Sequence, residues 1–138
     1  MAEVIGLASG LLTLVTFGLK SSASLYQAIN DFKSHQRNVR ELRDEIEALR
    51  QVLASLQQAI LDNKADFDPL KLPLLRCGTA CKDFEMVIVK ATERSHGPRT
   101  SFRDWAKLRY MGDDINGFKI TLESYKSTIM IALCDANL

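Results

Sequence analysis

Apolar residues recur at spacings of three and four along most of the chain, which is typical of helices that bury one face. The pattern covers residues 38–63, 74–94 and 113–134. No stretch alternates apolar and polar residues consistently, so strands are not expected. The apolar positions of the three segments are Val39, Leu42, Ile46, Leu49, Leu53, Leu56 and Ile60; Leu74, Cys77, Cys81, Phe84, Ile88 and Ala91; and Ile115, Phe118, Leu122, Tyr125, Ile129 and Ala132.

The first segment, residues 1–30, has a different pattern, because it is apolar on nearly all sides. No charged residue occurs from Val4 to Leu19. A helix over that stretch is about 24 Å long, short of the roughly 30 Å hydrocarbon core of a bilayer. Such a helix must be buried in protein or in lipid. The only charge before it is Glu3, whereas a signal peptide begins with positive charge, so export is disfavoured.

Small residues line one side of this first helix. Gly6 and Gly10 form a G-x-x-x-G motif, a spacing that lets two helices approach closely, above all in membranes. Two interpretations stay open: the segment is the central helix of a soluble bundle whose glycines admit a neighbour, or it acts on a membrane in a second state. The candidate membrane-targeting residues are Glu3, Val4, Ile5, Gly6, Leu7, Gly10, Leu11, Leu12, Leu14, Val15, Phe17 and Leu19.

Breaks in the pattern divide the chain into helices. Turn-forming residues at 62–73 predict a loop, and the runs at 95–98 and 112–114 predict two further interruptions around a short helix at 102–111. The sequence therefore predicts one all-α domain over residues 1–138, a bundle of four long helices and one short helix.

Composition removes several functional classes. The 138 residues carry a formal net charge of +1, so no overall field favours nucleic acid. The 3 cysteines are too few and odd in number for a secreted disulfide scaffold, so a reducing compartment is expected.

Candidate chemistry is sparse. Cys77 and Cys81 share one helix face, but no second pair of metal ligands accompanies them, so they are interpreted as buried thiols. Glu93 and His96 form one E-x-x-H motif, whereas di-iron bundles need two such motifs and two further carboxylates. Nucleophile elbows and phosphate-binding loops are missing from the sequence. No enzymatic activity, metal or cofactor is expected.

A basic segment with interleaved aromatic residues precedes the last helix. Its composition suits the headgroup region of an anionic membrane. It equally suits an ordinary helix that packs its tryptophan on the bundle and leaves its charges in water. The candidate headgroup residues are Arg99, Arg103, Trp105, Lys107 and Arg109.

The order of these features resembles the HeLo-like domain found at the N-terminus of fungal STAND (NLR-type) proteins and related cell-death effectors. The resemblance extends over almost the whole chain and is carried by degenerate motifs. It rests on the start Met1–Gly10, the stretch Arg40–Leu49 with Val52 and Leu53, Cys77, the stretch Trp105–Tyr110, and Ile115, Leu122, Tyr125–Ser127 and Ile131–Leu133.

The resemblance implies a cytosolic bundle that is oligomerised by an upstream NLR-type receptor or amyloid-signalling region. Its N-terminal helix is then exposed and targets or permeabilises the plasma membrane, with self-association and membrane lipids as the expected partners. The alternative is a non-lytic signalling or dimerisation domain. The stripe Val39–Ile60 is compatible with a resting monomer or dimer.

Overall fold

The chain forms an all-α bundle, in agreement with the sequence pattern. The computed structural model describes residues 2–30, 37–93 and 109–136, with side chains described for 10–30, 37, 39–90 and 115–136. Every regular element in these ranges is helical. The elements are α1 (Ala2–Asn30), α2 (Arg37–Leu61), the 3-10 turn η1 (Asp68–Leu70), α3 (Lys71–Glu93) and α5 (Arg109–Ala136).

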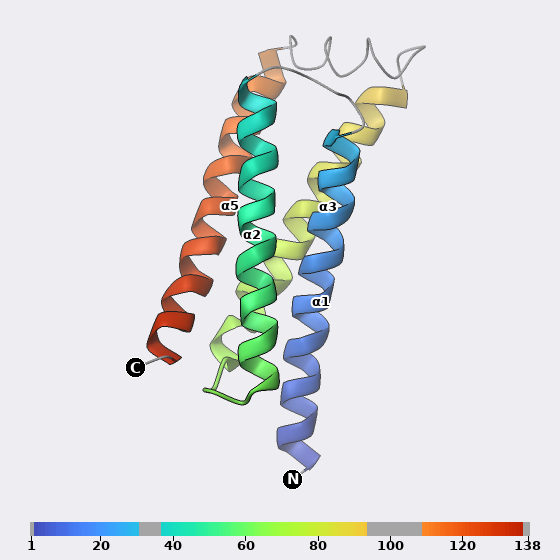
Figure 1. Cartoon of the computed structure of the whole chain (residues 1–138). Coiled ribbons are helices and arrows are strands. Elements are labelled where there is room, and N and C mark those ends of the chain that lie inside the picture. The colour runs from blue at the N-terminus through green and yellow to red at the C-terminus, as the bar shows by residue number, and fades with distance from the viewer. Residues whose placement is uncertain (1, 31–36, 94–108, 137–138) are drawn as a thin grey trace.

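The four long helices form a ring rather than a bundle with one central member (Figure 1). α1 packs against α2 and α3, and α5 packs against α2 and more lightly against α3. The expectation of a central first helix is therefore wrong, since α1 occupies one corner, diagonal to α5. The first turn of α1 and the last turn of α5 lie at the same end of the bundle.

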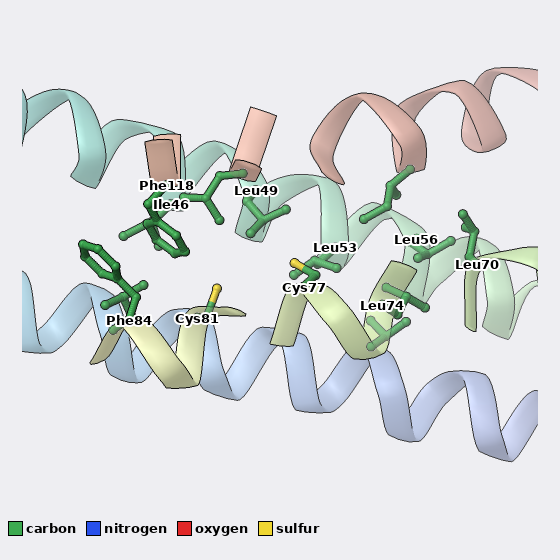
Figure 2. Packing of buried hydrophobic residues seen from close by; sticks show 14 of the residues in the cluster. Ile46, Leu49, Leu53, Leu56, Leu70, Leu74, Cys77, Cys81, Phe84 and Phe118 are labelled. Atoms are coloured by element: carbon green, nitrogen blue, oxygen red, sulfur yellow. The ribbon is translucent and has the colours of Figure 1, made fainter. Parts of the chain in front are cut away.

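The core is built from the stripes that the spacing predicted. All seven predicted positions of α2, from Val39 to Ile60, are buried. They meet the buried stripes of α3 and α5, and Figure 2 shows their side chains converging. Because the Val39–Ile60 stripe is consumed by the core of its own chain, it is not available as the seam of a dimer.

α1 contributes a narrow stripe to this core. Leu11, Val15, Leu25 and Ile29 are buried, and Ser22 is fully buried between them. The Ser22 hydroxyl donates a hydrogen bond to the carbonyl oxygen of Leu19 at 3.0 Å, which satisfies it inside the helix. Small residues thus allow α1 to lie close to its neighbours.

The connection between α2 and α3 is shorter than the predicted loop. Asn63 adopts a left-handed conformation (φ 54°), which ends α2, and Asp68–Leu70 form η1. α3 begins at Lys71 and includes Pro73 in its first turn. Proline is tolerated there because its missing N–H has no partner within the helix at that position.

The predicted break at 112–114 is also wrong, because α5 is already helical from Arg109. One glycine costs a helix about 1 kcal/mol. That cost is small against the packing of the long helix that follows. Most of the predicted short helix, residues 102–108, lies outside the described residues.

Candidate functional site

The N-terminal half of α1 is the segment in which the sequence concentrates its membrane-targeting candidates. Its first turns extend beyond the α2–α3 connection, past the end of the bundle (Figure 1). The backbone is helical from Ala2, while the side chains of Glu3, Val4, Ile5, Gly6 and Leu7 lie outside the described part. The start of the apolar segment of α1 therefore projects beyond the other helices.

The described candidates divide between two environments. Leu11 and Val15 belong to the core. Leu12, Leu14 and Leu19 are only partly buried at its edge. α1 therefore carries more apolar surface than its packing against α2 and α3 removes from solvent.

Gly10 has open space around it. A Cβ placed on this residue would have no atom of the described chain within 4 Å. The explanation that this glycine admits a neighbouring helix of the bundle is therefore wrong for Gly10. A glycine inside a helix lowers helix stability by about 1 kcal/mol relative to alanine. No close contact within the described chain explains why a glycine is present at this position.

The close contact of α1 is made instead by Phe17 against a glycine of α3. A Cβ on Gly78 would lie 2.5 Å from two carbons of the Phe17 ring, so α3 needs glycine at this position. Sequence analysis did not single out Gly78. The available signal was a glycine inside the amphipathic pattern between Cys77 and Cys81, but the pattern could not say which ring would rest on it.

Polar contacts secure α1 further along its length. The Ser24 hydroxyl donates to Glu85 Oε1 of α3 at 2.6 Å. Arg43 of α2 donates from Nη1 to Asn30 Oδ1 at 3.2 Å. Both contacts are exposed, so they stabilise the packing of α1 less than its buried apolar residues do.

The two cysteines of α3 are fully buried and point into the core, as expected of core thiols (Figure 2). The hydrogen bond with the Cys77 thiol and burial raise the pKa of Cys81, so the Cys81 thiol stays protonated at neutral pH. Burial also raises the pKa of the nearby Tyr125 hydroxyl. The described residues contain no cluster of three or more groups suited to a metal ion.

The interface between α2 and α5, on the side of the bundle away from α1, contains two ion pairs. Lys119 Nζ lies 2.6 Å from Glu41 Oε2, and Lys126 Nζ lies 3.3 Å from Glu45 Oε1. The hydrogen bond from Lys119, with a second from Arg37, lowers the pKa of Glu41 below its usual value. This seam contains none of the membrane-targeting candidates.

The remaining candidates fall where the structure is not described. Arg99, Arg103, Trp105 and Lys107 lie within residues 94–108, as does His96. Arg109 begins α5, but its side chain is outside the described part. The structure therefore does not test the basic segment or the E-x-x-H motif.

As far as their residues are described, none of the helices is long and apolar enough to cross a membrane. Comparison with curated proteins and with solved structures found no significant match. The sequence model of one family, described as pigment biosynthesis cluster protein PigL N-terminal, matches residues 2–138. Because this match covers nearly the whole helical bundle, the chain belongs to the PigL N-terminal family.

Proposed function

We propose that the bundle is a non-enzymatic, HeLo-like effector domain that acts on a membrane through α1 after oligomerisation. The resting form is cytoplasmic, and the target is the plasma membrane. The observation that carries the proposal is the N-terminal half of α1. It is apolar, it extends past the end of the bundle, and its Gly10 faces no neighbour.

Release of α1 has a definite structural cost. α1 lies between α2 and α3, and the other route joining those two helices runs through the lighter α3–α5 contact. Removing α1 from the chain therefore deprives α3 of its main partner, and a truncated protein is a poor test of function. A full-length chain in which α1 is locked in place is the better test.

The lock uses the Ser24–Glu85 contact between α1 and α3. We would replace both residues with cysteine and join them with a short bis-maleimide, since both side chains are accessible. The matched control joins cysteines at Glu45 and Lys126, which fastens the α2–α5 seam and leaves α1 unconstrained. Both proteins carry Cys134→Ser, because Cys134 is exposed and would also react.

The assay is dye release from vesicles of phosphatidylcholine and phosphatidylserine, with the protein clustered through an oligomerising tag. We expect the α1–α3 lock to abolish release and the α2–α5 lock to preserve it. Equal release from both would contradict the role of α1. Absence of release from the unlocked, clustered and folded protein would favour the non-lytic signalling or dimerisation domain.

Gly10 gives a second test of the same proposal. Gly10→Leu adds a large side chain where the described chain offers no obstacle within 4 Å of the Cβ, so the bundle should keep its stability. Close packing between α1 helices in a membrane assembly would be blocked. Dye release equal to that of the wild type would remove Gly10 from the mechanism.

The basic segment is proposed to contact anionic headgroups. Exchanging Arg103 and Lys107 for glutamate should weaken binding to anionic vesicles and leave binding to neutral vesicles unchanged. Equal binding of the variant and the wild type to anionic vesicles would contradict this part.

A further inference from the structure

Exposed leucines gather at one end of the bundle, around the α2–α3 connection and the projecting start of α1 (Figure 1). Leu61 ends α2 and is 60% exposed. Leu72 and Leu75, in the first turns of α3, are 52% and 46% exposed. With two half-buried residues of α1 they form the leucine cluster, which consists of Leu12, Leu14, Leu61, Leu72 and Leu75.

The packing of α1 on α3 fixes one side of the leucine cluster. The two helices run in the same direction, because Phe17 meets Gly78 and, further along both helices, Ser24 meets Glu85. Leu75 precedes Gly78 by three residues, as Leu14 precedes Phe17, so Leu75 lies level with Leu14. The exposed leucines of α3 therefore flank α1 where it leaves the bundle.

The packing of α1 on α2 fixes the other side. The two helices run in opposite directions, and a Cβ on Gly18 of α1 would lie 3.4 Å from a Leu53 methyl carbon of α2. Leu61 follows Leu53 by eight residues, so it lies level with the turn around Gly10. The leucine cluster thus borders α1 on two sides, just before its projecting turns.

The acidic residues next to the leucine cluster are engaged with groups of their own neighbourhood. Asp62 accepts a hydrogen bond from Gln58 Nε2 at 3.0 Å. Asp66 Oδ1 accepts one from the Asp68 N–H at 3.0 Å, and Asp68 Oδ1 pairs with Lys71 Nζ at 2.9 Å. These carboxylates therefore keep their partners when the surface beside them leaves water.

The charges of this part of the chain also cancel. Residues 61–76 hold three acidic and three basic residues, the other two bases being the exposed Lys64 and Arg76. On α1, Glu3 lies ahead of the leucine cluster and the exposed Lys20 lies behind it. A surface of balanced charge with exposed leucines gains little from a charged partner, so the burial of its apolar side chains decides what it binds.

Position and composition together select a lipid surface as the occupant. Any surface that the apolar start of α1 meets is brought up to the leucine cluster as well, since the cluster borders α1 from two helices. Leucine is under-represented among the residues that dominate protein–protein interfaces, where tryptophan, tyrosine and arginine prevail. Aliphatic side chains with basic neighbours are instead typical of peripheral contact with a bilayer.

We propose that the intact bundle docks through the leucine cluster on a zwitterionic phospholipid surface before α1 is released. This inference rests on the proposed function, for which it supplies the first contact with lipid. The contact is peripheral, so no helix has to cross the bilayer. It needs no anionic lipid and is insensitive to salt, in contrast to the contact proposed for the basic segment.

The first test is flotation with phosphatidylcholine vesicles of the whole, clustered chain in which α1 is locked to α3. Leu61→Ser with Leu75→Ser should weaken binding roughly 10-fold or more, because two exposed leucines no longer leave water. The matched control is Met86→Ser with Ile120→Ser, which are 50% and 69% exposed and lie nearer the opposite end of the bundle. The control should bind like the unaltered locked chain.

The second test reads which surface enters the bilayer. Leu75→Cys, in a chain that also carries Cys134→Ser, is labelled with a dye whose fluorescence rises in an apolar environment. Fluorescence should rise when phosphatidylcholine vesicles are added, whereas the same dye on Met86→Cys should not respond. Both sites are exposed in the same helix, and the remaining native cysteines are buried.

The inference and the proposed function fail in different ways. Binding of the locked chain that is lost in the leucine variant supports docking, even if no form of the protein releases dye from vesicles. The inference is overturned if the locked chain does not bind, if it binds only when phosphatidylserine is present, or if the leucine variant binds as well as its control. A silent dye at position 75 overturns it too, even where the unlocked chain releases dye.

A second copy of the chain is the other occupant that the tests separate. Light scattering gives the mass of the untagged chain with and without the two leucine substitutions. A dimer that the substitutions dissociate, in a chain that does not bind vesicles, would assign the leucine cluster to a second copy and overturn the lipid contact.

Discussion

The Phe17 ring of α1 rests directly on Gly78 of α3, where even a methyl group would lie 2.5 Å from the ring. This contact fixes the separation of the two helices that share the most extensive interface of the bundle. The helix proposed to act on membranes, α1, is therefore packed against α3 through the contact of the Phe17 ring with the Gly78 backbone.

Gly78→Ala should destabilise the fold by about 1–3 kcal/mol, because the new methyl group forces the Phe17 ring or α1 to move. Chemical denaturation measures the change in the free energy of unfolding. Gly10→Ala is the matched control, with open space at the Cβ and an expected gain of about 0.5–1 kcal/mol from helix propensity. If Gly78→Ala is as stable as Gly10→Ala, the close contact is not a constraint.

A smaller side chain at Phe17 should rescue the Gly78 variant. Phe17→Leu removes the ring that the methyl group strikes, so the double variant should be less destabilised than the sum of the two single changes. Strict additivity in this double-mutant cycle would show that the two residues are not coupled.

Phe118→Ala should loosen the contact between α3 and α5. The rings of Phe84 and Phe118 are stacked with centroids 4.3 Å apart and planes inclined by 1°, across a seam with little other contact. Loss of a buried phenylalanine costs about 3–5 kcal/mol, and hydrogen exchange should rise in α5 before α1. Met130→Ala, at a half-exposed site of the same helix, should change stability by less than about 1 kcal/mol.

The Glu41–Lys119 contact should make stability depend on acid pH. The pKa of Glu41 is lowered in the folded chain, so its contribution is present above the ordinary carboxyl pKa and is lost as pH falls through the folded value. Glu41→Gln should therefore lower Tm slightly near pH 7, with the difference from wild type shrinking as pH falls below the ordinary carboxyl range. Glu123→Gln, which removes an exposed carboxylate of α5, controls for the loss of charge. A difference between Glu41→Gln and wild type that does not shrink in acid would contradict the assignment.

The three cysteines should react at different rates with a thiol reagent. Cys134 is exposed and should be labelled at once, whereas Cys77 and Cys81 are buried. The raised pKa of Cys81 also keeps its thiolate scarce. Mass spectrometry should find one label per native chain and three after denaturation. Rapid native labelling of Cys81 would mean that the α1–α3 interface opens readily.

The spacing of apolar residues was enough to predict the core, because a helix that buries one face repeats its apolar side chains every three or four residues. Val39 through Ile60 illustrate this, since all seven are buried. The position of α1 at a corner could not be predicted, because a helix that is apolar on most sides has no preferred face. Gly78 was missed because its role depends on a ring 61 positions away in the chain. Gly112 was overvalued as a break, because local propensity yields to packing further along α5.

The two ends of the chain leave the bundle on the same side (Figure 1). A polypeptide attached beyond α5 would therefore start from the end of the bundle at which α1 begins, the end that would face a bilayer under the proposed function. A bulky attachment on a short tether would shield that surface sterically, whereas a long tether would allow it to approach. If α1 acts on a membrane as proposed, the length of the tether, and not only the identity of what it carries, would control the access of α1 to the bilayer.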